Sequence, residues 1–178
     1  MKKHYYTYDD VHTAAMHIVL QMYRDNWRPD YVVGITRGGL PLALRISHLI
    51  GCRMETLKVA LRDGADSECE TNCWMSEDAF GYVEGHDYKN SEVFNKKNIL
   101  VVDDINDTGA TFKWIKKDWQ SSCLSSNPSW DTVWGGNVRF AVMTENTSSE
   151  FGLVNYSWHE VNKAEEDVWL VYPWELDK

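Results

Sequence analysis

The sequence predicts an α/β fold in which a parallel sheet is flanked by helices. Two short apolar runs, at residues 31–35 and 99–102, have the length and the β-branched content of buried strands. Each run ends in a glycine-containing turn that leads into a helical pattern. Ligands of parallel α/β sheets bind in the crevice beyond the carboxyl ends of the strands, so these two turns are the first candidates for a functional site.

The length and charge of the whole chain exclude several classes of protein. A chain of 178 residues suits one domain with a substantial core, so we expect residues 1–178 to form a single domain. The net charge of −9 argues against binding nucleic acid through its phosphates. No apolar run approaches the roughly 18 residues of a membrane span, and residues 1–10 lack the apolar region of a signal peptide. We expect a cytoplasmic protein that binds neither nucleic acid nor membrane.

The four cysteines indicate free thiols. Cys69 and Cys73 are four residues apart, a spacing that suits a metal or a disulfide, but no second pair of ligands accompanies them. Neither Cys52 nor Cys123 belongs to a Cys-x-x-Cys pair. We therefore expect no structural metal and no disulfide.

A helix, a strand, a second helix and a second strand are expected in the first third of the chain. Thr7 starts the first helix, acids follow in its first turn, and apolar side chains then recur at helical spacing. His12 and His17 lie on this helix and are expected to be surface or packing residues. Gly51 ends the second helix, and apolar and polar residues alternate after it. The expected bounds are 8–24, 31–35, 40–50 and 54–61.

The composition changes between residues 63 and 92. This stretch has nine acidic residues against one lysine and no sustained hydrophobic period. Trp74 and Phe80 would nevertheless be unusual in a fully solvated loop. A segment of this length inside a compact domain is usually functional or disordered. We expect either a mobile lid or an inert surface insertion.

One helix and two strands are expected after the central strand. Phe112, Ile115 and Trp119 define one face of a helix at 109–121. Residues 138–143 are apolar enough for a fourth core strand. Residues 155–161 alternate between apolar and polar side chains, which predicts a more exposed strand outside the main sheet.

The turn after residues 99–102 carries the chemistry. Asp103 and Asp104 end the strand, and residues 108–111 offer backbone N–H groups and two hydroxyls at a helix N-terminus, which is an anion site. An acidic pair that binds hydroxyls beside a phosphate cradle indicates a phosphorylated sugar. With Asp107, three carboxylates crowd within five positions, where like charges repel. An acidic turn without any ligand would leave that crowding unexplained.

Two other motifs fail on these residues. An EF-hand loop that began at Asp104 would need Glu at its twelfth position, where the chain has Ile115. A Walker A loop would need Gly-Lys-Ser or Gly-Lys-Thr at its end. The one candidate glycine pair, Gly34 and Gly39, is followed by Leu40. Neither a calcium loop nor a P-loop is therefore expected.

Residues 99–111, ILVVDDINDTGAT, resemble the PRPP-binding signature of type I phosphoribosyltransferases, an apolar strand followed by two acids and a D-T-G-x-T turn. Two further segments agree. Residues 37–39, Arg-Gly-Gly, are similar to the pyrophosphate loop of the xanthine-guanine and hypoxanthine enzymes. Residues 167–175 are similar to the W-x-x-x-P-W-[DE] end of xanthine-guanine phosphoribosyltransferases. The resemblance implies the type I phosphoribosyltransferase fold, with a small hood at 150–178.

The resemblance also implies a reaction, Mg²⁺-dependent transfer of ribose 5-phosphate from PRPP to a purine base with release of pyrophosphate. Asp103 and Asp104 would bind ribose hydroxyls, or Mg²⁺ through water, and Asp107 would hold the proton at N7 of the base. Residues 63–92 would close as a lid, and the chain would form a homo-oligomer, a dimer or a tetramer. The implied contacts are Thr36, Arg37, Gly38 and Gly39 for pyrophosphate, Asp107, Thr108, Gly109, Ala110 and Thr111 for the 5-phosphate, and Trp169, Leu170 and Asn146 for the base.

Two departures from the family leave the base open. Asn146 stands where xanthine-guanine enzymes carry a lysine that contacts the purine 6-oxo group. The mobile loop begins Leu61-Arg62-Asp63 instead of with a Ser-Tyr element. Trp169 either stacks on the base or is a core tryptophan. The alternatives to a purine enzyme are a non-catalytic PRPP-binding regulator and a phosphoribosyltransferase for another base.

Overall fold

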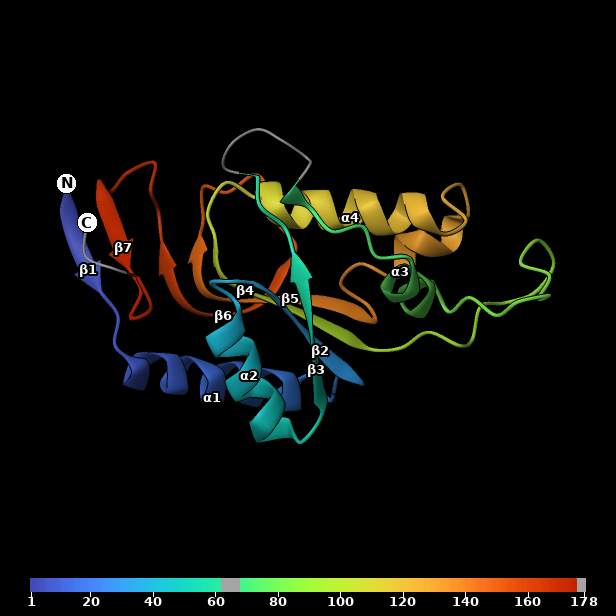
Figure 1. Ribbon diagram of the computed structural model, residues 1–178, viewed down its shortest axis with the longest axis horizontal. Helices are drawn as coiled ribbons and strands as arrows, with labels where there is room; N and C mark the ends of the chain where they lie inside the picture. Colours follow the sequence, from blue (N-terminus) through green and yellow to red (C-terminus); the bar gives the residue numbers. More distant parts are fainter. Residues whose placement is uncertain (62–67, 176–178) are drawn as a thin grey trace.

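A five-stranded parallel sheet forms the centre of the protein (Figure 1). The computed structural model describes residues 1–61 and 68–175. The strand order is β3-β2-β4-β5-β6, and every neighbouring pair is parallel, which confirms the predicted fold class. The strands are β2 (Tyr31–Thr36), β3 (Arg53–Lys58), β4 (Ile99–Asn106), β5 (Val138–Asn146) and β6 (Val154–Val161).

Helices cover both faces of the sheet because the central strands are apolar on both sides. On β4, Leu100 and Val102 pack with α1 (Tyr8–Arg24) and α2 (Leu40–Ile50). Ile99 and Val101 point the other way and pack with α3 (Cys73–Phe80) and α4 (Ala110–Ser122). Figure 1 shows the two helix layers on opposite sides of the sheet. The predicted bounds of α1 and α2 are confirmed.

A second, two-stranded sheet joins the two ends of the chain. β1 (Lys2–Tyr5) runs parallel to β7 (Val168–Val171), with Lys3 opposite Trp169. This small sheet lies at one end of the molecule, at the left of Figure 1. The N-terminal residues carried no sequence signal for a strand, and of the two strands within residues 150–178 only β7 lies in this small sheet, because β6 belongs to the main sheet.

The prediction for residues 155–161 is wrong in one respect. This segment is β6, which pairs in parallel with β5 inside the main sheet. Tyr156 and Val161 are buried in the core that β6 shares with α1, and the other side chains are more exposed. The alternation that suggested a separate strand is that of an edge strand with one covered face.

Only the first residues of the described part of 63–92 lie at the carboxyl end of a strand. These residues return to the end of β3, where the Glu70 N–H donates to the Lys58 carbonyl at 2.8 Å. Then α3 runs to the opposite end of the sheet, where the Asn137 amide before β5 donates to the Ala79 carbonyl at 2.9 Å. The lid prediction also covers residues 62–67, which lie outside the described residues.

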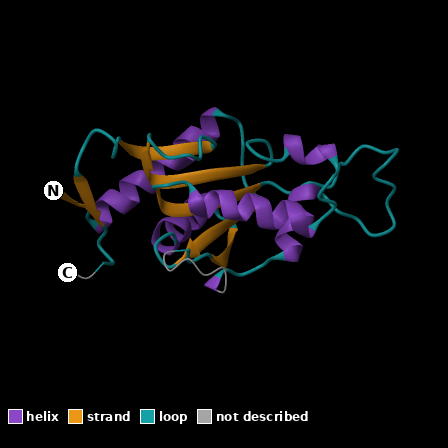
Figure 2. Ribbon diagram, turned by 90° about the horizontal axis from the view of Figure 1, so that it is seen from above, coloured by secondary structure: helices purple, strands orange, loops and turns teal. Residues whose placement is uncertain are grey.

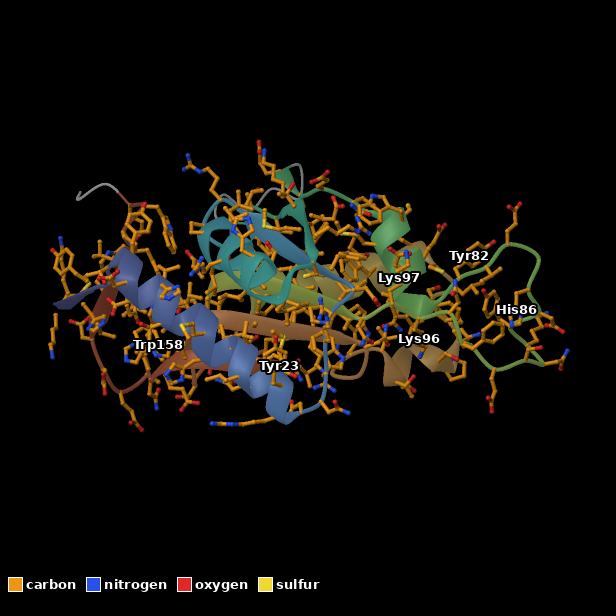
Figure 3. The ribbon with its side chains drawn as sticks, turned by 90° about the horizontal axis from the view of Figure 1, so that it is seen from below. Tyr23, Tyr82, His86, Lys96, Lys97 and Trp158 are labelled. Atoms are coloured by element: carbon orange, nitrogen blue, oxygen red, sulfur yellow. The ribbon has the colours of Figure 1, made fainter. Side chains whose placement is uncertain are left out.

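The loop from residue 81 to residue 98 leads from α3 back to the start of β4 at the amino ends of the strands. The Lys97 N–H donates to the Asp78 carbonyl at 3.0 Å, and Tyr31, the first residue of β2, donates to the Asp78 carboxylate at 2.9 Å. Figure 2 shows this loop extending from the end of the molecule opposite to both chain termini. Tyr82 and His86 lie on it, far from Trp158 of β6 (Figure 3).

Candidate active site

Asp103 and Asp104 lie near the carboxyl end of β4, which continues past the predicted run 99–102 to Asn106. The Asp104 N–H donates to the Asp103 carboxylate at 2.9 Å, and the Ile105 N–H donates to the Asp104 carboxylate at 2.8 Å. Burial raises the pKa of Asp104, while a hydrogen bond with Asp103 acts in the opposite direction. Burial makes the charge of Asp104 costly, so a cation bound beside it would stabilise that charge.

The loop after β2 packs directly on this acidic pair. A Cβ on Gly38 would lie 2.2 Å from the Asp104 Oδ2 atom, and a Cβ on Gly39 would lie 2.5 Å from the Val102 carbonyl oxygen. The two glycines thus allow the loop to touch the end of β4. The peptide bond between Thr36 and Arg37 is cis, and the Arg37 side chain is exposed. The structure therefore brings residues 36–39 beside the acidic pair.

The turn from residue 108 to residue 111 begins α4. Gly109 has a φ of +91°, and a Cβ there would lie 2.7 Å from the Phe151 Cβ, so the turn requires glycine. Ala110 and the exposed Thr108 line a cavity of about 370 Å³. Because the first N–H groups of a helix have no partner inside the helix, this cavity can bind an anion. The other residues that line it are Asp107, Lys113, Asn146, Ser148 and Glu150.

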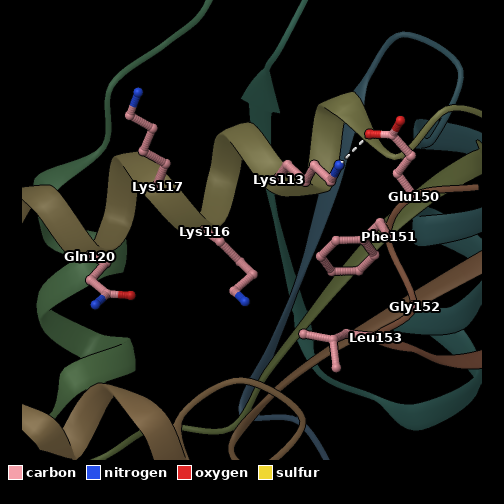
Figure 4. A pocket seen from close by; sticks show the side chains of 8 residues that line it. All are labelled: Lys113, Lys116, Lys117, Gln120, Glu150, Phe151, Gly152 and Leu153. Carbon is pink, nitrogen blue, oxygen red and sulfur yellow. Dashed lines mark hydrogen bonds and ion pairs between the residues drawn. The ribbon is translucent and has the colours of Figure 1, made fainter.

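A second cavity, of about 410 Å³, adjoins the first along α4. Lys113 and Glu150 line both cavities and form an ion pair at 2.6 Å, which Figure 4 shows as a dashed line. Lys116 and Lys117 extend from the same helix in Figure 4. The side of α4 next to the turn is therefore basic, although the chain as a whole carries a charge of −9.

Asp107 takes part in an ion pair that the sequence did not indicate. Its Oδ2 atom lies 3.0 Å from the ammonium of Lys163, which follows β6. The Asn146 amide donates to the Asp107 carbonyl at 2.9 Å. Asn146 also accepts from the N–H groups of Ser148 and Lys163, at 3.3 and 3.0 Å. The predicted base contact Asn146 is thus buried and joins the ends of β4, β5 and β6.

The two predicted base contacts on β7 differ in exposure. Trp169 is 54% exposed, so it is not a core tryptophan, and its indole is accessible to a ligand. Leu170 is buried in the core beside α1. Sequence reasoning missed Tyr6 and Tyr172. Their rings stack with centroids 5.0 Å apart, and both hydroxyls form hydrogen bonds with the Thr144 hydroxyl at the end of β5. These bonds fix the small sheet against the edge that holds the acidic pair.

The residues at this edge fit Mg²⁺ bound together with a substrate. Among the described residues there is no group of three or more His, Cys, Asp or Glu side chains that would hold a metal alone. Mg²⁺ usually binds through one or two carboxylates plus substrate phosphates, and Asp103 and Asp104 offer such a pair. All four cysteines are free thiols, as predicted. No described helix is long and apolar enough to cross a membrane.

Comparison with known proteins agrees with this geometry. The phosphoribosyl transferase domain family matches residues 4–117. A purine phosphoribosyltransferase from Pyrococcus horikoshii Ot3 is 20% identical with a TM-score of 0.63, over 100% of this chain and 97% of the other. A Helicobacter pylori xanthine-guanine-hypoxanthine phosphoribosyltransferase is 16% identical with a TM-score of 0.63, over 97% of this chain and 91% of the other. The comparison with curated proteins found no match.

The chain belongs to the phosphoribosyl transferase domain family, because the match covers more than half of it and includes the turns at 36–39 and 108–111. It is a phosphoribosyltransferase, an enzyme that uses PRPP. The likeness to the two solved structures shows a shared fold over nearly the whole chain.

Proposed function

We propose that this enzyme transfers ribose 5-phosphate from PRPP to a purine base of the guanine, xanthine and hypoxanthine class, as in purine salvage. The observation that carries the proposal is the meeting of two turns at one edge of the sheet. A Cβ on Gly38 would lie 2.2 Å from Asp104 Oδ2, so the loop for a leaving pyrophosphate touches the acids for a ribose. The helix N-terminus of α4 lies at the same edge and suits the 5-phosphate.

The reaction breaks the bond between ribose C1 and the pyrophosphate oxygen and forms a bond from C1 to N9 of the base. Negative charge develops on pyrophosphate, where Arg37 and the N–H groups of Gly38 and Gly39 would stabilise it. Mg²⁺ held by Asp103 and Asp104 would supply further neutralisation of this charge. The proton at N7 of the base passes to Asp107 as the new bond forms.

Binding at several points would hold the ribose in register for attack. The N–H groups and hydroxyls of residues 108–111 would fix the 5-phosphate, while the acidic pair fixes the ribose hydroxyls. Trp169, exposed on β7, offers a flat surface for the base. The names of the two neighbours, a purine enzyme and a xanthine-guanine-hypoxanthine enzyme, support a purine as the base.

A panel of bases tests the proposal. Purified enzyme receives PRPP and Mg²⁺ with hypoxanthine, guanine, xanthine, adenine, orotate or uracil, and pyrophosphate release and the nucleotide product are measured. We expect turnover with the 6-oxopurines. Turnover only with orotate or uracil would make this an enzyme for another base. PRPP binding by calorimetry without turnover of any base would instead identify a PRPP-binding regulator.

A further inference from the structure

Lys113 supplies a positive charge that the phosphate turn itself lacks. Residues 107–111 contain one carboxylate and neither lysine nor arginine, whereas a phosphate monoester carries about 1.5 to 2 negative charges at pH 7. Among the described residues that line the cavity at this turn, Lys113 alone is positively charged. Its N–H donates to the Gly109 carbonyl at 3.1 Å, which places it one turn into α4. Because the Cα–Cβ bonds of a helix tilt toward its N-terminus, the Lys113 side chain can reach back over the turn.

The partner of this ammonium in the structure is Glu150. The Lys113 Nζ and Glu150 Oε2 atoms lie 2.6 Å apart (Figure 4). The hydrogen bond with Lys113 and the charge of its ammonium lower the pKa of Glu150, so the carboxylate is ionised at neutral pH. The Lys113 and Glu150 side chains are 48% and 81% exposed, and an ion pair in such contact with water contributes little to stability. A phosphate bound at the turn can therefore displace Glu150 from Lys113 at small cost.

Only the side chain of Glu150 has to move in such an exchange. The Glu150 backbone is fixed against the turn, because its N–H donates to the Thr108 carbonyl at 3.2 Å. The next residue, Phe151, packs where a Cβ on Gly109 would lie. The Glu150 carboxylate is exposed and can rotate into water. The turn can therefore keep its conformation while Lys113 changes partner.

We propose that Lys113 binds the 5-phosphate of PRPP, and that of the nucleotide product, in exchange for Glu150. A phosphate offers the ammonium more charge and more acceptor oxygens than one carboxylate does. Glu150 is then a positioning residue, which holds the ammonium beside the turn and competes with the phosphate for it. This inference rests on the proposed function, in which the 5-phosphate lies at residues 108–111, and it does not depend on which base is used.

Calorimetry with ribose 5-phosphate tests the exchange, and pyrophosphate with Mg²⁺ is the ligand whose affinity should not change. Lys113→Met should bind ribose 5-phosphate about 10-fold more weakly, and Lys113→Arg should keep most of the affinity. Glu150→Gln should bind it about 2- to 5-fold more tightly, because the competing carboxylate is gone. The KM for PRPP should change in the same direction as each affinity predicts, with kcat little changed, because the 5-phosphate does not react. If the ion pair were only structural, both substitutions would act in the same direction.

Two exposed residues provide matched controls. Lys117→Met removes a positive charge from the same helix, and Glu84→Gln removes a negative charge from the loop at the amino ends of the strands. Both should leave the affinity for ribose 5-phosphate within about twofold of the wild type. An unchanged affinity in Lys113→Met, or weaker binding in Glu150→Gln, overturns the inference. A wild-type enzyme that turns over no 6-oxopurine, while these variants shift ribose 5-phosphate binding in opposite directions, overturns the proposed function and supports the exchange.

Discussion

At the scale of single residues, the site depends on how closely backbone and carboxylate approach one another. Asp104 Oδ2 occupies the space where any side chain at position 38 would begin, 2.2 Å from that Cβ position. The same packing buries the carboxylate and raises the pKa of Asp104. Burial therefore disfavours the ionised form of this carboxylate, and a cation that binds with an anionic ligand would stabilise it.

The double variant Asp103→Asn/Asp104→Asn tests the acidic pair. We expect it to lose Mg²⁺-dependent PRPP binding, measured by calorimetry, with affinity at least about 100-fold weaker. Because burial raises the pKa of Asp104, replacing this carboxylate by a neutral amide should not lower the melting temperature at pH 8. Asp131→Asn, an exposed acid, is the control. Unchanged PRPP affinity in the double variant would falsify the assignment.

Glu145 gives the protein a pH-dependent stability. Burial raises the pKa of Glu145 to about 7, and the charge of Glu160 adds to this, although a hydrogen bond with Asn106 lowers it. In the unfolded chain the pKa of this carboxyl is about 4.3, so between about pH 4.3 and pH 7 the folded protein binds more protons than the unfolded chain. The stability of the fold therefore falls as the pH rises through this range.

Glu145→Gln removes this dependence. At pH 8 the variant should be more stable than the wild type by about 1 kcal/mol, a figure reduced for solvent screening of a half-exposed carboxylate. Below about pH 4 the difference should vanish, since Glu145 is then neutral in both states. Urea unfolding at both pH values measures it, with the exposed Glu165→Gln as the control for losing one negative charge. Equal stabilities at pH 8 would contradict the burial argument.

Lys163 shows why part of the site escaped sequence reasoning. The signature at residues 99–111 is contiguous, so its residues could be placed from the sequence, and Asp103 and Asp104 do lie on a core strand, which continues to Asn106. Lys163 reaches Asp107 only because β6 pairs beside β5. Nothing in the local sequence around residue 163 encodes that pairing, since it depends on the order of strands in the sheet.

At the scale of elements, sequence periodicity predicted the helices whose bounds are set by local interactions. The helix α1 begins at a capping box between Thr7 and Asp10, and its predicted bounds are those observed. Helix α3 was not predicted, because its eight residues give too little periodicity and its burial comes from packing against α4. Likewise β1 pairs with β7 across nearly the whole chain, which no local pattern reports.

Gly109 tests how tightly the phosphate turn is built. Gly109→Ala should destabilise the protein by about 2–3 kcal/mol, because an alanine meets Phe151 at 2.7 Å and is strained at a φ of +91°. Gly51→Ala, with a φ of +77° in open space, should cost about 1 kcal/mol, from backbone strain alone. Gly152→Ala has open space and should be neutral. Urea unfolding that ranks Gly109→Ala level with Gly152→Ala would refute this account.

At the scale of the whole molecule, the two ends of the sheet have different roles. The Tyr172 hydroxyl lies 3.4 Å from the Asp104 carbonyl oxygen and 3.0 Å from the Thr144 hydroxyl, and these contacts tie the small sheet to the carboxyl ends of the strands. The loop from residue 81 to residue 98 lies at the amino ends, with Phe94 78% exposed. Ligand binding should therefore alter the protein at the carboxyl ends of the strands and leave the amino ends unchanged.

Two tryptophans report on these two ends. Trp74 packs against Tyr31 and Arg53, the first residues of β2 and β3. The ring centroids of Trp74 and Tyr31 are 5.9 Å apart. The guanidinium carbon of Arg53 lies 5.9 Å from the centroid of the Trp74 ring. These residues are separated from the PRPP turns by the length of the strands. Trp169, the proposed base contact, lies exposed on β7.

We expect PRPP with Mg²⁺ and a base analogue to change the emission of Trp169 and to leave that of Trp74 unchanged. The two signals are obtained by difference, from Trp169→Phe and Trp74→Phe against the wild type. Hydrogen exchange should slow at residues 36–39 and 103–111 on ligand binding, because N–H groups there bind phosphates, and should stay the same at residues 81–97. A ligand-dependent change at Trp74, or protection across residues 81–97, would mean that α3 and its loop move with the site. The segment from residue 68 to residue 92 would then act as a lid from the far end of the sheet.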